Sequence, residues 1–142
     1  MRLKFANAKA WLSYTEPMIE FFDPPEIGSS RPFSRATRAA GLVFVSGQAA
    51  PHDLALGIDC GATATDEVRN ALELLKQILI KAGSKLEQVV QVTMLLTNPD
   101  DYEECNQEYV KHFPAGKPAR HTVRFGVPTQ ARVAFSCIAV AD

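Results

Sequence analysis

The chain has 142 residues, of which 46% are hydrophobic and 22% are charged, and its formal net charge is −1. This composition fits one compact domain with a hydrophobic core, and it argues against intrinsic disorder. A near-neutral charge gives no electrostatic attraction for nucleic acid or for an anionic membrane surface, so neither partner is expected. No apolar run approaches the length that spans a membrane.

The three cysteines, Cys60, Cys105 and Cys137, contain no CxxC pair. Buried thiols in a reducing compartment are the simplest interpretation, and Cys105 and Cys137 are expected in the core. The first ten residues carry charges without an uninterrupted apolar stretch after them, so a secretory signal is not expected. We therefore expect a cytoplasmic protein. His52 and His112 have no partner at metal-ligand spacing, and no metal site is expected.

The residues from 1 to 31 are predicted to form an extended N-terminal arm, followed by the folded domain over residues 32–142. Prolines and glycines interrupt any helix in this arm. Its aromatic residues, which include Trp11 and Phe21, would be left in water by a disordered leader. The arm is therefore expected to lie against the body of the protein or against a neighbouring subunit.

A hairpin is predicted next, with strands over 33–39 and 42–46 joined by a turn at Ala40-Gly41. The stretch 49–62 reads as a loop that can hold a short edge strand. Apolar residues then recur at i, i+3 and i+4 spacing, which predicts a helix over 65–82. Thr63 or Thr65 can cap its start, and Gly83 ends it.

The run over 89–97 is the strongest strand signal in the sequence. Its nearly continuous apolar character predicts a central strand that is buried on both faces. Asn98 as N-cap and Pro99 at the first helical position begin a second helix. The buried face of that helix is expected to comprise Tyr102, Cys105, Tyr109 and Phe113. Two final strands are expected at about 119–125 and 131–140.

The predicted element order, ββαβαββ, defines an α+β fold. A mixed sheet with both helices on one face is the simplest arrangement of these elements. The other face of the sheet then needs a cover, and too few elements remain in the chain to supply one. A second copy of the chain is therefore expected to cover it.

Several motifs in chain order resemble those of the RidA (YjgF) family. They are Pro32-Phe33-Ser34, Gly41 to Gln48 (GLVFVSGQ), Lys81-Ala82-Gly83, Leu86 to Thr93 (LEQVVQVT), Asn106-x-x-Tyr109-x-x-x-Phe113, Pro118-Ala119-Arg120 and Ile138-Ala139-Val140. The resemblance covers about residues 32 to 140. It implies a chorismate-mutase-like fold, assembled as a homotrimer with a barrel-like core and with ligand clefts between subunits.

The resemblance also implies an activity, the cofactor-independent hydrolysis of small carboxylate-bearing imines and enamines of the 2-aminoacrylate type. The products are a 2-keto acid and ammonia. Arg120 would hold the substrate carboxylate, since its planar guanidinium offers paired N–H donors that stay charged. Thr122 and Ser136 are the other candidate catalytic residues. The candidate substrate-binding residues are Gly47, Phe33, Asn106 and Ala134.

Each of these residues also has a structural alternative. Arg120 can instead form an internal salt bridge, and Gly47 can be a simple strand-end glycine. Thr122 and Ser136 can line a cleft or pack in the sheet. His121 follows Arg120 and must point to the opposite face of the sheet.

Three departures from the family pattern are present, and two of them, at Ala134 and Phe33, favour a second hypothesis. Ala134 stands where the family's deaminases usually have a water-activating glutamate, Phe33 stands in place of a tyrosine, and Thr122 in place of a frequent cysteine. Loss of one general base typically costs about 10²–10⁴ in rate. The alternative is a non-catalytic or altered-chemistry trimer that binds a small carboxylate metabolite in the same cleft. RNA cleavage, attached to some relatives, is disfavoured because no basic-aromatic pattern is present.

Overall fold

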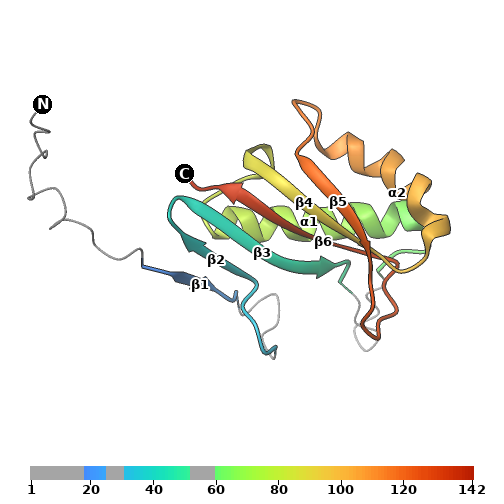
Figure 1. Ribbon diagram of the computed structural model, residues 1–142, viewed down its shortest axis with the longest axis horizontal. Coiled ribbons are helices and arrows are strands. Elements are labelled where there is room, and N and C mark those ends of the chain that lie inside the picture. The colour runs from blue at the N-terminus through green and yellow to red at the C-terminus, as the bar shows by residue number, and fades with distance from the viewer. Residues whose placement is uncertain (1–17, 25–30, 52–59) are drawn as a thin grey trace, which may run out of the picture.

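The computed structural model describes residues 18–24, 31–51 and 60–142 (Figure 1). Over these residues the chain forms strands β1 (Glu20–Phe22), β2 (Ala36–Ala39), β3 (Leu42–Ala49), β4 (Val89–Leu96), β5 (Ala119–Arg124) and β6 (Val133–Val140). The α-helices there are α1 (Ala64–Lys81) and α2 (Tyr102–Tyr109). Short 3-10 turns are η4 (Leu86–Gln88), η5 (Pro99–Asp101) and η6 (Val110–His112).

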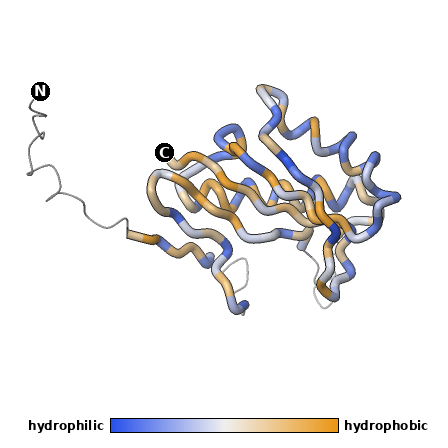
Figure 2. The backbone as a smooth tube through the Cα atoms, in the orientation of Figure 1, coloured by the Kyte–Doolittle hydropathy of each residue, from blue (hydrophilic) through white to orange (hydrophobic). Residues whose placement is uncertain are grey.

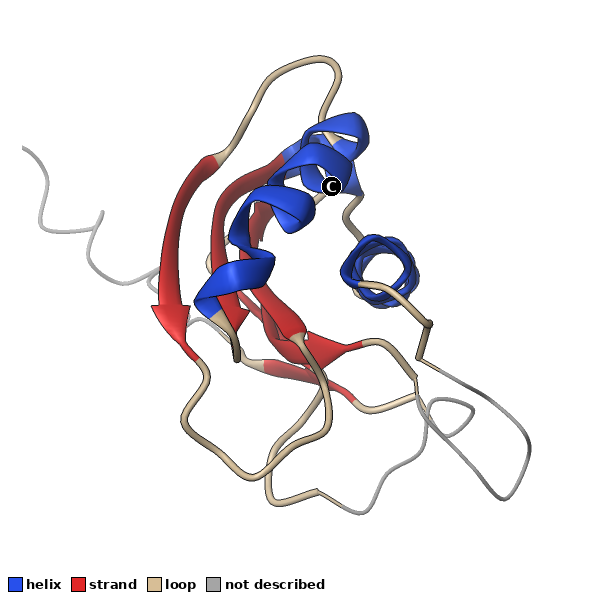
Figure 3. Ribbon diagram, turned by 90° about the vertical axis from the view of Figure 1, so that its right-hand side faces the viewer, coloured by secondary structure: helices blue, strands red, loops and turns tan. Residues whose placement is uncertain are grey.

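The six strands of this described part form one mixed sheet in the order β1-β2-β3-β6-β4-β5. The β4–β5 pair is parallel, and the other pairs are antiparallel. Both α-helices lie on the same face of the sheet (Figure 3). The predicted α+β fold with two helices on one face is therefore confirmed, and β1 is an additional strand ahead of the predicted order.

Strand β1 comes from the N-terminal arm. It pairs with β2, so that Phe21 lies opposite Thr37, and it forms one edge of the sheet. Phe22 packs against the core, whereas Met18 and Phe21 are largely exposed. Residues 1–17 and 25–30 of the predicted arm and residues 52–59 of the predicted 49–62 loop lie outside the described residues.

Helix α1 follows the sequence prediction closely. The Thr63 side chain caps its start by accepting a hydrogen bond from the Asp66 N–H, at 3.2 Å. Gly83 follows its end with a φ of +79°, a conformation that favours glycine. A Cβ at this position would lie 2.3 Å from Nη1 of Arg38, so the tip of that flexible side chain would have to move. The backbone conformation is therefore the main reason for a glycine here.

The hydrophobic core lies between the sheet and the helices. The inward side chains of the sheet include Val43, Val92 and Phe135, and each is fully buried. Figure 2 shows that hydrophobic residues run along the central strands. These side chains alternate with others that face away from the helices, as a strand's two-residue period requires.

The face of the sheet opposite the helices, called here the open face, carries exposed apolar side chains. Phe44, Val90, Val123 and Val140 are each at least 40% exposed. The expectation that β4 is buried on both faces is therefore wrong within one protomer, because both helices cover the same side. Val90 of β4 is 46% exposed, while Val92 is buried.

The first residue of α2 also departs from the prediction. Tyr102 was expected on the buried face of this helix and is 43% exposed, whereas Cys105, Tyr109 and Phe113 are buried as expected. The turn before Tyr102 is the 3-10 turn η5. Tyr102 is the first residue of α2, and its neighbours Glu103 and Glu104 are exposed as well, so the helix begins at the surface and meets the core only from Cys105 onward.

An ion pair between a buried carboxylate and a partly exposed arginine joins α1 to the segment that precedes β6. The side chain of Glu67 is 1% exposed, and its Oε1 accepts a hydrogen bond from the Arg132 backbone N–H at 2.9 Å. Its Oε2 accepts a second from Arg132 Nη1 at 2.8 Å. Hydrogen bonding to this carboxylate raises the pKa of the Arg132 guanidinium.

We expect Glu67→Ala to lower the free energy of unfolding by about 2 kcal/mol, because two charge-assisted hydrogen bonds are lost from a buried position. Urea unfolding at fixed protein concentration measures this loss. Glu73→Ala is the matched control, since Glu73 lies on the same helix with its side chain 55% exposed. Equal losses in the two variants would contradict a stabilising role for the Glu67–Arg132 pair.

Candidate functional site

Arg120 is the second residue of β5 and points toward the helices. In the parallel β4–β5 pair it lies in register with Val92, whose side chain is buried beneath the helices. Residues in register on adjacent strands project from the same face. The Arg120 side chain therefore meets α2, where Asn106 and Tyr109 lie one turn apart.

The Arg120 guanidinium has two neutral contacts. Its Nη2 donates a hydrogen bond to Oδ1 of Asn106 at 2.7 Å, and its central carbon lies 4.6 Å from the ring centre of Tyr109. The second contact is a cation–π interaction. Within the described residues no carboxylate forms an ion pair with Arg120. The expected structural alternative, an internal salt bridge, is therefore not seen in this part of the chain.

The hydrogen bond to Asn106 leaves most of the Arg120 donors unused by the described residues. An arginine carries five N–H donors in a planar fork. Because Asn106 accepts at Nη2 alone, one edge of the fork keeps two parallel donors. Such an edge matches the two oxygens of a carboxylate. The residue is partly buried, so part of its surface remains open to solvent.

Tyr109 was assigned only to the buried face of α2, and its contact with Arg120 was missed. Its ring lies between Phe113 and Phe135, with centroid distances of 4.9 Å and 5.9 Å. Burial raises the pKa of its hydroxyl, while the nearby Arg120 charge acts in the opposite direction. The i, i+3 spacing of Asn106 and Tyr109 was the available signal, since it places both on one side of the helix.

Thr122 lies on the same face as Arg120. It is in register with the buried Met94 and is itself partly buried. Two residues along a strand are separated by roughly 7 Å, so Thr122 can reach a small molecule that is held by Arg120. The structure thus brings together Arg120, Asn106 and Thr122 among the predicted site residues.

Gly47, Ala134 and Ser136 lie on the open face instead. Ala134 and Ser136 alternate along β6 with the core residues Phe135 and Cys137. A bulge in β3 between Val45 and Gln48 sets Gly47 against the segment around Ser136. Ala134 is 1% exposed, so its side chain presents almost no surface to a ligand in this protomer. The predicted site is therefore divided between the two faces of one sheet.

Phe33 lies near the β3 bulge, in the bend that precedes β2. The carbonyl of the next residue, Ser34, accepts a hydrogen bond from the Ser46 hydroxyl at 2.7 Å. Phe33 is 48% exposed. This contact places Phe33 at the same end of β3 as Gly47. In the sheet, β6 and β4 separate β3 from β5, which carries Arg120.

A polar row crosses the open face beside Ser136. Thr93 of β4 is paired with Ser136 on one side and with His121 on the other. Thr93 Oγ1 lies 3.0 Å from His121 Nε2. His121 thus points to the face opposite Arg120, as predicted. Ser136 and His121 are two strands apart, roughly 10 Å, so His121 cannot take the Ser136 proton directly.

A small pocket of about 150 Å³ lies elsewhere in the described part of the chain. It is lined by Glu87, His112, Phe113, Pro114, Ala115 and Gly116. None of the predicted site residues lines it. His112, which carries no metal-ligand spacing in the sequence, lies 3.2 Å from the buried carboxylate of Glu108.

Cys105 and Cys137 are buried, as expected. Burial raises the pKa of the Cys105 thiol to about 11, with Asp101 and Glu104 acting in the same direction. Burial raises the pKa of the Cys137 thiol to about 12. Neither thiol is ionised near neutral pH, so neither is a nucleophile in the folded protein.

A thiol reagent such as DTNB at pH 8 should therefore react slowly with Cys105 and Cys137 in the folded chain and rapidly after denaturation. Cys60 is partly exposed and is the residue expected to react first. Cys60→Ser should abolish the fast phase. A fast phase that survives in this variant would show that a buried thiol is accessible.

Comparisons with known proteins agree with this fold. The family model described as Endoribonuclease L-PSP matches residues 24–141. The mitochondrial protein mmf2 of Schizosaccharomyces pombe is 37% identical over 112 residues, which cover 76% of this chain and 86% of the relative. Reactive Intermediate Deaminase A, chloroplastic, of Arabidopsis thaliana is 33% identical over 113 residues, which cover 76% of this chain and 58% of that protein.

Solved structures show the same similarity. A Thermotoga maritima protein superposes with a TM-score of 0.75 and 30% identity, covering 87% of this chain and 98% of that one. A YjgF family member from Neisseria meningitidis superposes with a TM-score of 0.73 and 28% identity, covering 88% and 96%. The fold and the Arg120 site thus define an α+β protein of the YjgF type. The chain belongs to the RidA (YjgF) family.

Proposed function

We propose that this protein is a cofactor-independent hydrolytic deaminase of small imines and enamines that carry a carboxylate, of the 2-aminoacrylate type. The observation that carries the proposal is the Arg120 guanidinium, which has neutral contacts only among the described residues and keeps an edge with two donors. The relative named Reactive Intermediate Deaminase A supports a role of the same kind. Substrate identity and turnover remain part of the proposal.

The proposed chemistry needs little from the protein. The enamine tautomerises to an imine, whose carbon is already electrophilic, and water adds to that carbon. The resulting carbinolamine expels ammonia and leaves the 2-keto acid. Arg120 holds the carboxylate and fixes the imine carbon. The Thr122 hydroxyl, on the same face, is placed to orient the water.

The expected homotrimer belongs to this proposal. Its support is the open face of the sheet, where Phe44, Val90, Val123 and Val140 leave an apolar surface without a cover from the described residues. A second copy would bury this surface. Within one protomer the sheet separates Ser136 and Gly47 from Arg120. Association of copies could bring Ser136 or Gly47 of one protomer close to Arg120 of another.

The proposed location is the cytoplasm, on the grounds of the reduced cysteines. Among the described residues, no helix is both long and apolar enough to cross a bilayer. Two relatives from Schizosaccharomyces pombe are named as mitochondrial proteins. Fractionation of cells that produce the full chain would decide between these compartments.

Arg120→Ala should lower kcat/KM for imine hydrolysis at least tenfold, because the carboxylate anchor is lost. The imines are generated in place by an amino-acid oxidase, and ammonia release is measured against the free decay of the imine. Arg124→Ala is the matched control, since Arg124 ends the same strand and is exposed. If the wild-type protein gives no acceleration with any amino acid, the deaminase proposal fails.

A binding-only function is the second candidate. The observation that favours it is Ala134, a buried methyl group where the family's deaminases usually have a glutamate. Under this alternative, the wild-type protein binds a 2-keto acid such as pyruvate and Arg120→Ala does not, while neither protein releases ammonia. Titration with pyruvate, together with the ammonia assay, therefore separates the two candidates.

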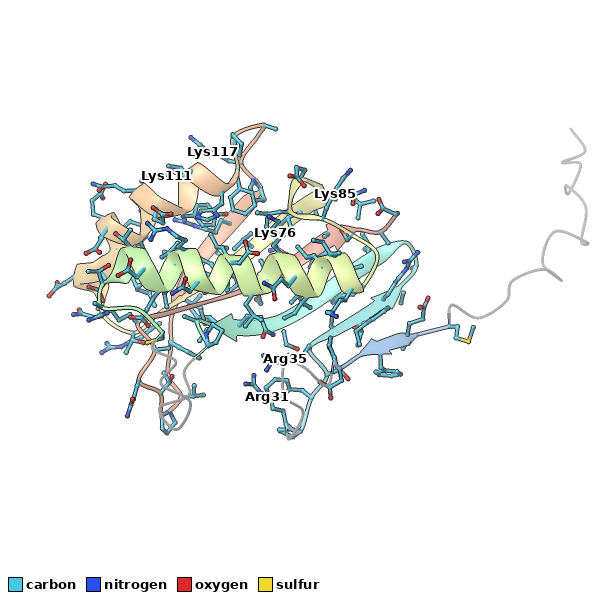
Figure 4. All side chains as sticks on the ribbon, turned by 180° about the vertical axis from the view of Figure 1, so that it is seen from behind. Arg31, Arg35, Lys76, Lys85, Lys111 and Lys117 are labelled. Atoms are coloured by element: carbon cyan, nitrogen blue, oxygen red, sulfur yellow. The ribbon has the colours of Figure 1, made fainter. Side chains whose placement is uncertain are left out.

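RNA is not among the proposed substrates, although the matching family model is named for an endoribonuclease. The formal net charge is −1. Lys76 lies on α1, Lys111 on η6, and Lys85 and Lys117 in loops, while Arg31 and Arg35 lie apart from them, below the helices in the view of Figure 4. A single-stranded RNA site would require a continuous basic groove with stacking aromatic residues. Incubation with a labelled RNA tests this exclusion.

Phe44→Glu should convert the trimer to monomers, because a charge placed on the open face cannot be buried without a partner. Light scattering coupled to size-exclusion chromatography measures the mass. Ile80→Glu is the control, since Ile80 is 57% exposed on α1 at the other side of the molecule. A wild-type protein that elutes as a monomer would contradict the trimer.

A further inference from the structure

Arg120 is held by two neutral groups of α2, which we call the neutral clamp: the Asn106 amide oxygen and the Tyr109 ring. We infer that Asn106 and Tyr109 are positioning residues, which fix the guanidinium of Arg120 for a carboxylate ligand without neutralising its charge. The inference rests on the proposed function and deepens it. It also changes the role of Asn106, which was predicted to bind the substrate and instead contacts the arginine.

The two contacts restrict different motions of the guanidinium. The hydrogen bond from Nη2 to Asn106 fixes the direction of one end of the fork, at 2.7 Å. The ring of Tyr109, 4.6 Å from the guanidinium carbon, blocks one side of its plane. A free arginine side chain loses much rotamer entropy when it binds a ligand. A side chain that is already held loses less, so binding is tighter.

The clamp is itself supported by the core. Tyr109 is 4% exposed and packs against Phe113 of the same helical segment and Phe135 of β6. Asn106 lies one helical turn before Tyr109 on α2. Because both positions belong to one packed helix, the amide oxygen and the ring keep a fixed relation to each other.

The neutrality of the clamp has a chemical consequence. An aspartate or glutamate at position 106 would form a bidentate ion pair with Arg120 and compete with the ligand for the same donors. An amide oxygen accepts a single hydrogen bond from the fork and brings no negative charge. The charge of Arg120 is thus kept for an incoming anion.

The Tyr109 hydroxyl is not part of the clamp. It is buried and has no hydrogen-bond partner among the described residues. Only the face of the ring contacts the arginine. A phenylalanine would keep that face, so it should keep the function of the tyrosine, whereas a leucine would remove it.

The experiment titrates pyruvate, a product-type 2-keto acid, into the wild-type chain and variants, with binding followed by calorimetry. Tyr109→Phe should bind within twofold of the wild type. Tyr109→Leu should bind about tenfold more weakly, the size of a partly buried cation–π contact. Asn106→Asp, which keeps the shape of the side chain, should weaken binding at least tenfold because it pairs with Arg120.

Leu79→Ala is the control for loss of packing, because Leu79 is fully buried in the same core but lies on α1 and is not part of the clamp. It should lower stability as Tyr109→Leu does and leave pyruvate binding within twofold. In the imine assay Tyr109→Leu should raise KM more than it lowers kcat. If Tyr109→Leu and Asn106→Asp bind like the wild type while Arg120→Ala does not, the clamp is overturned and the proposed function stands.

A second readout tests the clamp without any ligand. In a ¹⁵N NMR spectrum the Arg120 Nε–H signal, assigned by its absence in Arg120→Ala, should be shifted upfield by the Tyr109 ring and show a rigid heteronuclear NOE. Both features should persist in Tyr109→Phe and vanish in Tyr109→Leu. An unchanged signal in Tyr109→Leu overturns the clamp. The wild-type chain can also show the upfield-shifted, rigid signal and yet neither bind pyruvate nor release ammonia. That result would retain the clamp and reject the proposed function.

Discussion

The interaction on which this site depends is the contact of one arginine with two uncharged partners. Arg120 donates to the Asn106 amide oxygen and lies over the Tyr109 ring, and the described residues supply it with no carboxylate. A buried or half-buried cation usually finds an acidic partner, because desolvation of an unpaired charge is costly. Here the amide and the aromatic face lower that cost without removing the charge, which is a suitable state for a receptor of anions.

The rest of the fold serves to hold these groups in place. Helix α2 carries Asn106 and Tyr109 and packs through Cys105 and Tyr109 onto the core. The parallel pairing of β5 with β4 aims Arg120 and Thr122 at this helix. The Glu67–Arg132 pair fixes the segment between β5 and β6 to α1. The open face, by contrast, leaves apolar side chains and the Ser136–Thr93–His121 row without a cover from the described chain, which favours association with other copies.

Catalysis by such a site would depend mainly on positioning. Cys105 and Cys137 are held in the thiol form by burial, and Ser136 lies too far from His121 to be activated by it. Ala134 carries no base. An imine carbon that is already electrophilic can react with water without a strong general base, whereas a less reactive substrate would need one. Under the proposed function, such a site would favour highly reactive substrates.

The sequence by itself determined most of the elements and identified Arg120 as the candidate anchor. Local signals were sufficient for α1, since the Thr63 cap, the apolar period and Gly83 all act within a few residues, and the motif around Arg120 indicated a carboxylate receptor. Only the tertiary structure decided which candidates share a face. The alternation along β5 and that along β6 cannot be related across the intervening turn, so the sequence did not show that Arg120 and Thr122 face the helices while Ala134 and Ser136 face away. The sequence also did not show that one face of β4 is left uncovered, or that Tyr109 contacts Arg120. Both depend on how segments that are distant in the sequence pack together.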